Sequence, residues 1–221
     1  MKSLSSGFAL IELLFSMAIM LIVLGSFYGL TSFIYRDYAG QIALAETRQE
    51  SRVATTFFQN EIQNAGLDPS GTAFNGGQLN TKIFPNCKQT LQTVEPIIEA
   101  SETVFHFMGD KNANGNNGDS NEDVRYEWVG EKGEDGCKEK RTPYTLYRDT
   151  GGGQQEVALG IQSFRLDYFD ENGTLLPAGF LTKDERIKIR KVVLTLRPLT
   201  KNDTKKEERE WTSEIYLKNI G

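Results

Sequence analysis

The sequence predicts an α+β protein in which a long N-terminal helix packs on an antiparallel β-sheet. Residues 8–65 contain no proline, and the first half of this stretch is almost entirely apolar. Beyond Pro69, short runs of β-branched and aromatic residues alternate with glycine-rich turns, which is typical of antiparallel strands. One long helix followed by a mainly β domain satisfies both observations.

The first element is an apolar segment of 28 residues, Phe8 to Tyr35, in which Glu12 is the only charged residue. About 20 apolar residues suffice to cross a bilayer. The apolar region of a cleaved secretory signal has only about 7–15 residues, so this segment is too long to be one. Lys2 indicates that the amino end stays in the cytoplasm. We therefore predict a transmembrane helix, although hydropathy alone also fits a plain signal anchor.

Glu12 is the unusual feature of this segment. An unpaired ionisable group inside a membrane span costs about 3 kcal/mol or more, so such a group indicates function. Lys2 lies ten residues away and is too distant to pair with it. Cleavage after Gly7 would create a charged amine on Phe8, at about the depth of Glu12. The interpretation that follows is a pairing between Glu12 of one chain and the new amine of another.

The second half of the predicted helix is polar and amphipathic. Alanine, glutamine, glutamate and arginine are frequent here, and all are reasonable helix formers. Gly66, with Pro69 close behind, predicts the end of the helix. A helix over residues 8–65 would be roughly 85 Å long. Its expected apolar face comprises Ile42, Ala45, Val53, Phe57 and Ile62.

The remaining chain reads as a sheet of about four to six strands. The runs that favour strands are TVFHFMG, VRYEWVG, TPYTLYRD, GIQSFRLDYFDENG, KIRKVVLTLRP and WTSEIYLKNIG. The expected organisation is therefore a leader at residues 1–7, a transmembrane half-helix at 8–35, an exposed amphipathic half-helix at 36–66 and a β head at 67–221.

The N-terminal string SSG followed by FALIELLFSMAIMLIVLG resembles the amino termini of type IV prepilins and pseudopilins. The matching features are a short polar leader ending in Gly7, Phe8 after it, and Glu12 four residues further on. The resemblance implies that a prepilin peptidase cuts after Gly7 and N-methylates Phe8. It also implies that Glu12 acts in filament assembly. The partners implied are other major and minor pilins, the peptidase, an inner-membrane assembly platform and, before assembly, lipid.

Later runs, among them SRVATTFFQNEIQNAGLDPSG and LYRDTGGGQQEVALGIQSFRLDYFDENG, resemble PilW-like minor pilins. Major pilins often carry a proline in the membrane segment, whereas this chain has none before Pro69. We therefore predict a minor pilin that acts in filament assembly, at initiation or at the tip. The expected location is the inner membrane with a periplasmic head, and then the pilus. The alternatives are a J-type minor pseudopilin of type II secretion and a membrane-anchored binding module.

The segment DKNANGNNGDSNED is dense in oxygen ligands and resembles the opening of a calcium loop. An EF-hand needs a bidentate glutamate at its twelfth position, which here is Asn121, so this is not an EF-hand. Calcium loops of this kind also occur in pseudopilins and minor pilins. The alternative is a plain turn between strands. The expected calcium ligands are Asp110, Asn112, Asn114, Asp119 and Glu122.

The rest of the composition argues against other functions. A net charge of −5 and the absence of a basic stripe argue against nucleic-acid binding. Cys87 and Cys137 are either two buried thiols or one disulfide, and the oxidising compartment implied by the membrane segment favours the disulfide. His106, the single histidine, lies in an apolar run and is expected to be structural. Because no catalytic constellation emerges, we do not expect an enzyme.

Overall fold

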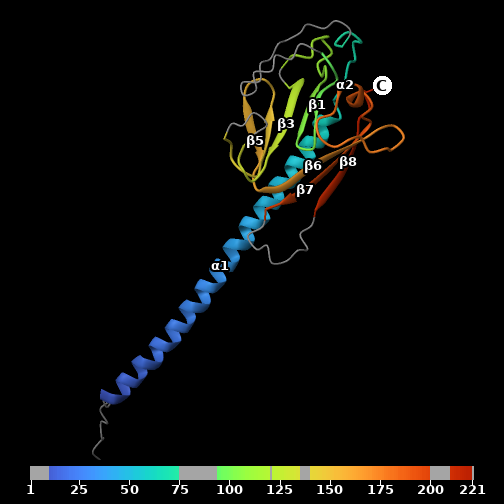
Figure 1. Ribbon diagram of the computed structural model, residues 1–221. Coiled ribbons are helices and arrows are strands. Elements are labelled where there is room, and N and C mark those ends of the chain that lie inside the picture. Colours follow the sequence, from blue (N-terminus) through green and yellow to red (C-terminus); the bar gives the residue numbers. More distant parts are fainter. Residues whose placement is uncertain (1–9, 75–93, 120, 135–139, 200–209, 221) are drawn as a thin grey trace, which may run out of the picture. The chain divides into compact units, whose positions relative to one another are not determined.

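The computed structural model describes residues 10–74, 94–119, 121–134, 140–199 and 210–220. Within these residues, helix α1 (Leu10–Ile62) precedes eight strands and the short helix α2 (Lys183–Arg186). Figure 1 shows α1 leading into the strands of the head. The α+β class predicted from the sequence is confirmed. The chain divides into two compact units, Met1–Ala45 and Glu46–Gly221, and the boundary falls inside α1. The four functional segments expected from the sequence are a different division and stay a prediction.

The second unit is built around the last turns of α1. Ala54, Phe58 and Ile62 are fully buried there. Residues four apart lie on one face of a helix, so these three form a continuous stripe against the core. The ring of Phe58 makes edge-to-face contacts with Tyr126 at 4.8 Å and with Phe164 at 6.0 Å between ring centroids. These two partners belong to different sheets, so one helical side chain ties both sheets together.

The expected apolar face of this half of α1 is partly wrong. Ile62 is buried as expected, but Val53 and Phe57 are 61% and 46% exposed. The buried stripe is displaced by one position and begins with the small residues Ser51 and Ala54. Small side chains allow the helix to lie close to the sheets, and a pattern that counts only large apolar residues does not detect them.

The first sheet has five antiparallel strands in the order β1-β2-β3-β4-β5. Phe105, Phe107, Val124, Tyr126 and Leu146 contribute its side of the core. The strands are β1 (Ile97–Ala100), β2 (Val104–Met108), β3 (Asp123–Val129), β4 (Thr145–Asp149) and β5 (Gln154–Ala158).

The second sheet has three antiparallel strands, β6 (Ile161–Phe169), β7 (Lys191–Pro198) and β8 (Trp211–Tyr216), with β7 in the middle. The sequence predicts all three of these strands and also β2, β3 and β4, but as one sheet. It does not predict β1 and β5, the two edge strands of the larger sheet. β1 has only four residues, and β5 is largely polar and exposed, so neither carries a clear strand pattern.

The end of α1 is joined to the loop that follows β2. The amide of Gly66 donates to the carbonyl of Met108 at 2.8 Å, and the amide of Asp110 donates to the carbonyl of Leu67 at 2.7 Å. Gly66 has φ +75°, which confirms the predicted glycine stop. A Cβ placed on Gly109 would lie 2.1 Å from the carbonyl oxygen of Asn64, so only glycine fits this junction. The oxygen-rich loop, residues 110–122, starts here.

Candidate functional site

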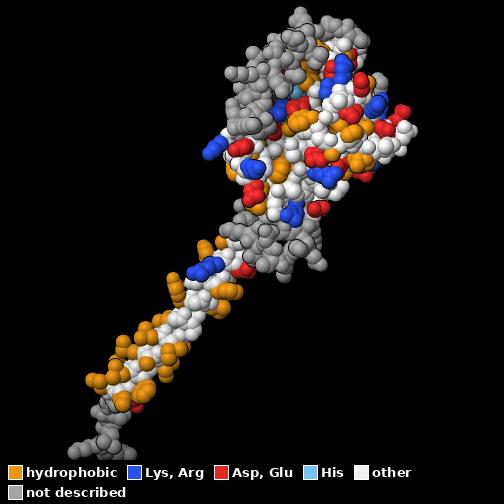
Figure 2. All heavy atoms as spheres, in the orientation of Figure 1, with side chains coloured by type: hydrophobic (Ala, Val, Ile, Leu, Met, Phe, Trp, Pro, Cys, Tyr) orange, Lys and Arg blue, Asp and Glu red, His pale blue; other side chains and the backbone are white. Residues whose placement is uncertain are grey.

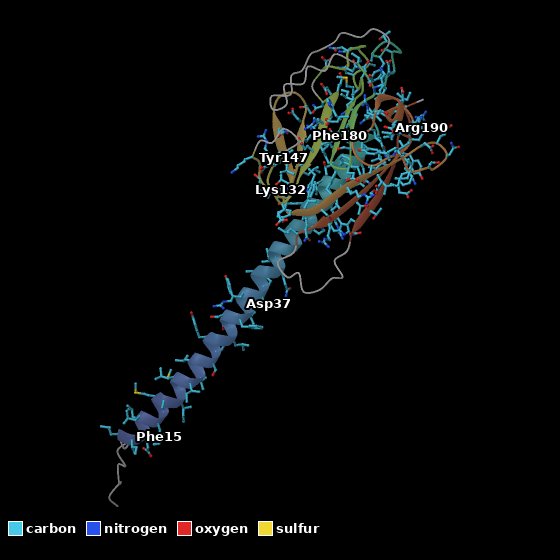
Figure 3. The ribbon with its side chains drawn as sticks, in the orientation of Figure 1. Phe15, Asp37, Lys132, Tyr147, Phe180 and Arg190 are labelled. Atoms are coloured by element: carbon cyan, nitrogen blue, oxygen red, sulfur yellow. The ribbon has the colours of Figure 1, made fainter. Side chains whose placement is uncertain are left out.

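The first part of α1 has an apolar surface that the other described residues of the chain do not bury. Figure 2 shows apolar side chains gathered along this stretch of the helix, and Phe15, labelled in Figure 3, is 66% exposed. Among the described residues, Leu10–Ile42 is the one helical stretch long and apolar enough to cross a membrane. A helix that is apolar on every side needs lipid or another protein around it.

Three hydroxyl groups in this stretch form hydrogen bonds within the helix. Ser16, Ser26 and Thr31 each donate a hydrogen bond of 2.7–2.8 Å to the carbonyl oxygen four residues earlier. A hydroxyl without such a partner would be costly to bury in an apolar surrounding. This pairing was not anticipated from the sequence, although serine and threonine in an apolar helix are a usable signal for it.

Glu12 lies in the first turn of α1, where its side chain is exposed. The predicted processing residues, Gly7 and Phe8, lie outside the described residues. Gly25 and Gly29 are four residues apart, and a Cβ on either would meet nothing within 4 Å. The backbone is therefore accessible at both positions, as close helix packing requires.

The predicted calcium ligands lie together in the loop between β2 and β3. Asp110 and Glu122 are buried, with exposed fractions of 0% and 2%. The carboxylate of Asp110 accepts the amides of Asn114 and Gly115, and one oxygen of Glu122 accepts the amides of Lys111 and Asn112. Both carboxylates thus fix the backbone of the same loop.

Asp119 lies on the more exposed side of this loop. Its carboxylate accepts the side-chain amides of Asn112, Asn114 and Asn116 at 2.7–3.0 Å. No three carboxylate, cysteine or histidine side chains in the described part of the chain form a preformed metal cluster. A cation in the loop would therefore need asparagine or backbone oxygens in addition to the acids.

Comparison with known families is informative at the N-terminus. Residues 2–28 match the model for the prokaryotic N-terminal methylation motif. The chain carries a prepilin-type methylation motif. The matched residues include Gly7, Phe8 and Glu12, so the match supports a protein of the type IV pilin or pseudopilin class. No curated protein matches the chain significantly.

The site residue missed by sequence reasoning is Glu61, near the C-terminal end of the motif-bearing helix. Arg148 donates two hydrogen bonds to its carboxylate, from Nε at 2.8 Å and from Nη2 at 2.7 Å. The hydroxyl of Tyr126 donates a third at 2.5 Å. Burial, followed by the charge of Glu61, raises the pKa of Tyr126, so this hydroxyl remains protonated and able to donate.

Two further sequence expectations concern the head. His106 lies in β2 and is 1% exposed, and its Nε2 lies 2.6 Å from an oxygen of Asp123. A buried, paired histidine in the middle of a sheet is consistent with the structural role expected for it. Cys87 and Cys137 lie outside the described residues, so their pairing stays a prediction.

Proposed function

We propose that the protein is a minor pilin, made as a precursor, cleaved after Gly7, N-methylated on Phe8 and incorporated into a type IV pilus. The observation that carries this proposal is the methylation motif at residues 2–28, followed by a helix whose apolar side chains are exposed in the part of the chain that the structure describes. The methylation motif implies processing by a prepilin peptidase, and proteins of the pilin-like class are structural rather than enzymatic.

In this proposal, lipid surrounds residues 10–42 before assembly, and helices of neighbouring subunits replace the lipid in the filament. Gly25 and Gly29 provide places where two backbones approach closely. Cleavage leaves an amine on Phe8 that stays charged after methylation. Phe8 and Glu12 are separated by about 6 Å along a helix axis, at 1.5 Å per residue. A modest stagger between two helices therefore brings the amine of one subunit next to Glu12 of another.

The finer assignment is to the PilW-like minor pilins, with a head in the periplasm before assembly and a place at initiation or at the tip of the filament. The partners are other major and minor pilins and the inner-membrane assembly platform. A J-type minor pseudopilin of type II secretion shares the same helix and outline, and is the second candidate. The two differ in the machine that uses the subunit. Loss of pili after gene deletion supports the first, and loss of protein secretion supports the second.

Replacement of Glu12 by alanine tests the assembly role. We expect filament number to fall at least tenfold while the amount of subunit in the membrane is unchanged, because the charged amine then lacks its partner. Asp37→Ala is the matched control, since Asp37 is also an exposed acid on α1 (Figure 3) and has no proposed partner in another subunit. Normal filament numbers with Glu12→Ala would refute the pairing.

Intact mass spectrometry tests the processing separately. The mature protein should lack residues 1–7 and carry one added methyl group. Recovery of the full-length chain with its initial methionine from cells with an active peptidase would contradict the precursor assignment.

A further inference from the structure

A groove of about 880 Å³ lies on the head where the chain leaves α1. Four stretches that are distant in sequence bound it: the residues after α1, the residue before β1, the residues after α2 and the residues after β8. Grooves of this size that are mostly apolar are the usual binding sites for small ligands and short peptide segments. The apolar side chains on its walls are Leu67, Pro69, Phe74, Pro96, Ile187 and Ile220.

Among the described lining residues, Arg190 is the one cation, and Figure 3 labels it on the head. Its Nη1 donates to the carbonyl oxygens of Ile187 at 2.8 Å and Ile189 at 3.1 Å. In the described part of the chain, no acid forms an ion pair with Arg190. The donors that remain, Nε and Nη2, lie on one edge of the planar guanidinium. A carboxylate binds to that edge through two parallel N–H···O bonds.

Asp68 is the one acid among the described lining residues, and its carboxylate already has partners. It accepts the hydroxyl of Ser70 and the amides of Thr72 and Phe74, at 3.0–3.4 Å. These bonds hold the turn that follows α1. Asp68 forms no ion pair with Arg190, so a carboxylate from outside has no described competitor for the free edge of this guanidinium.

Asn219 adds a hydrogen-bond acceptor to the groove. Its Nδ2 donates to the carbonyl oxygen of Gln63 at 3.0 Å, which fixes the side-chain amide and leaves Oδ1 for a donor from outside. Nearly every peptide unit carries such a donor, whereas the tail of a fatty acid has none. Apolar walls with one acceptor and one cation therefore favour a peptide segment that bears an acid.

The neighbouring stretch of the same chain does not have this chemistry. Residues 75–93 follow Phe74 directly, but they contain Lys82 and Lys88 and no acid, so they offer no carboxylate to Arg190. A second protein is the better source. The surface of a folded head presents loops and their side chains, so the carboxylate is that of an aspartate or a glutamate.

We propose that this groove docks a surface segment of a neighbouring subunit, in which an acidic side chain stands beside apolar side chains. Arg190 binds the carboxylate, Ile187 and Phe74 contact the apolar side chains, and Asn219 accepts a backbone amide. The identity of the partner as a subunit rests on the proposed function, whereas the chemistry of the groove does not depend on it.

The test uses the full chain in detergent micelles and, as its probe, the fluorescein-labelled peptide Leu-Glu-Phe-Leu with a blocked carboxyl end. Fluorescence anisotropy measures binding, and micelles without protein give the background. Leu-Gln-Phe-Leu is the matched peptide, because glutamine keeps the shape of glutamate without its charge. The glutamate peptide should bind at least about tenfold more tightly, since hydrogen bonds to a charged group are the stronger ones.

Two pairs of variants locate the binding. Arg190→Gln should remove the preference for the glutamate peptide. Arg165→Gln should keep it, because Arg165 pairs with Asp167 and does not line the groove. Ile187→Ser should weaken binding of both peptides at least about threefold, through lost apolar contact. Leu175→Ser is its control, since Leu175 and Ile187 are 53% and 54% exposed and only Ile187 lines the groove.

Equal binding of the two peptides by the unmodified chain would overturn the proposal, and so would an Arg190→Gln variant that retains the preference. Should Arg190→Gln not fold, Ile187→Ser decides, because Ile187 is exposed and unchanged binding would exclude the groove. Tighter binding of decanoate than of the glutamate peptide would assign the groove to an amphiphile instead of a subunit. None of these results bears on cleavage after Gly7, so failure of the docking proposal is distinguishable from failure of the pilin assignment.

Discussion

Replacement of Glu61 by alanine removes the anchor by which α1 is held to the five-stranded sheet. The side chains of Glu61 and Arg148 are 12% and 10% exposed, so their pair is largely shielded from water. Removing one partner of a buried ion pair costs about 3–5 kcal/mol, because the other charge stays buried without compensation. Arg148 retains its hydrogen bond to Asn121 and its position 5.5 Å from the ring centre of Phe57. We therefore expect the lower end of the range, about 3 kcal/mol.

Urea unfolding of the full chain in detergent, followed by near-ultraviolet circular dichroism, measures this loss. In thermal unfolding of the same protein, a loss of about 3 kcal/mol corresponds to a drop in the melting temperature of roughly 6–12 °C for a head of this size. The matched variants are Arg148→Met and the double variant. Removing both side chains leaves neither charge buried without its counter-charge, so the double variant should be more stable than the sum of the single effects by at least about 1.5 kcal/mol.

A loss below about 1 kcal/mol for Glu61→Ala would show that the pair contributes no more than an exposed surface salt bridge. If the free-energy losses of the two single variants add up to that of the double variant, Glu61 and Arg148 act independently, and this result would be equally decisive. Either result would refute the conclusion that this network docks the helix on the sheet.

Two further changes test other parts of the head. Gly109→Ala should lower the free energy of unfolding in urea by about 3 kcal/mol, because the new Cβ would overlap a backbone carbonyl at the end of α1. Gly152→Ala is the control: a Cβ there meets nothing within 4 Å, so the free energy of unfolding should change by less than about 0.5 kcal/mol. Partial burial favours the neutral form of Glu95, but two cations outweigh it: Nζ of Lys183 and Nη2 of Arg186 lie 2.7 Å and 2.9 Å from the carboxylate oxygens. The pKa of Glu95 is therefore lowered from its ordinary value of 4.5. A lowered acid pKa stabilises the fold above the unfolded value, and this stability is lost as pH falls through the folded value. The unfolding midpoint of the parent chain should therefore drop below about pH 4.5 more steeply than that of Glu95→Gln, and parallel pH curves would contradict the pairing.

The parts of the fold that follow from local pattern could be predicted from the sequence. The apolar segment and the glycine stop at Gly66 depend on neighbouring residues, and so do the six strands with β-branched and aromatic alternation. The edge strands β1 and β5 could not be predicted, because hydrogen bonds to β2 and β4 define them rather than their own composition. The phase of the buried stripe on α1 failed for a similar reason, since Ala54 and Ser51 are buried by what the sheets present to them.

The candidate sites divide in the same way. Glu12 stands out because one acid in a long apolar run is unusual by itself. The oxygen-rich loop can be recognised because its predicted calcium ligands lie close together in the sequence. Glu61 could not be found, because it is one of several acids on a polar helix. Its partner Arg148 lies 87 residues further along the chain. Only the packing of β3 and β4 against α1 brings Tyr126, Arg148 and Glu61 together.

The two parts of α1 differ in what surrounds them, and this contrast limits what the protein can do alone. In the second unit, one narrow face of the helix is buried in the hydrophobic core of the head through Ala54, Phe58 and Ile62. In the first unit, none of the apolar window of Leu10–Ile42 is buried, and exposed apolar side chains follow one another around the helix as far as Tyr35. Removing apolar area from water stabilises both parts in the same way. The second part gains this free energy when the head folds, whereas folding of the described residues removes none of the apolar surface of the first part from water. The first part of α1 must therefore acquire its apolar surroundings from lipid or from other protein chains.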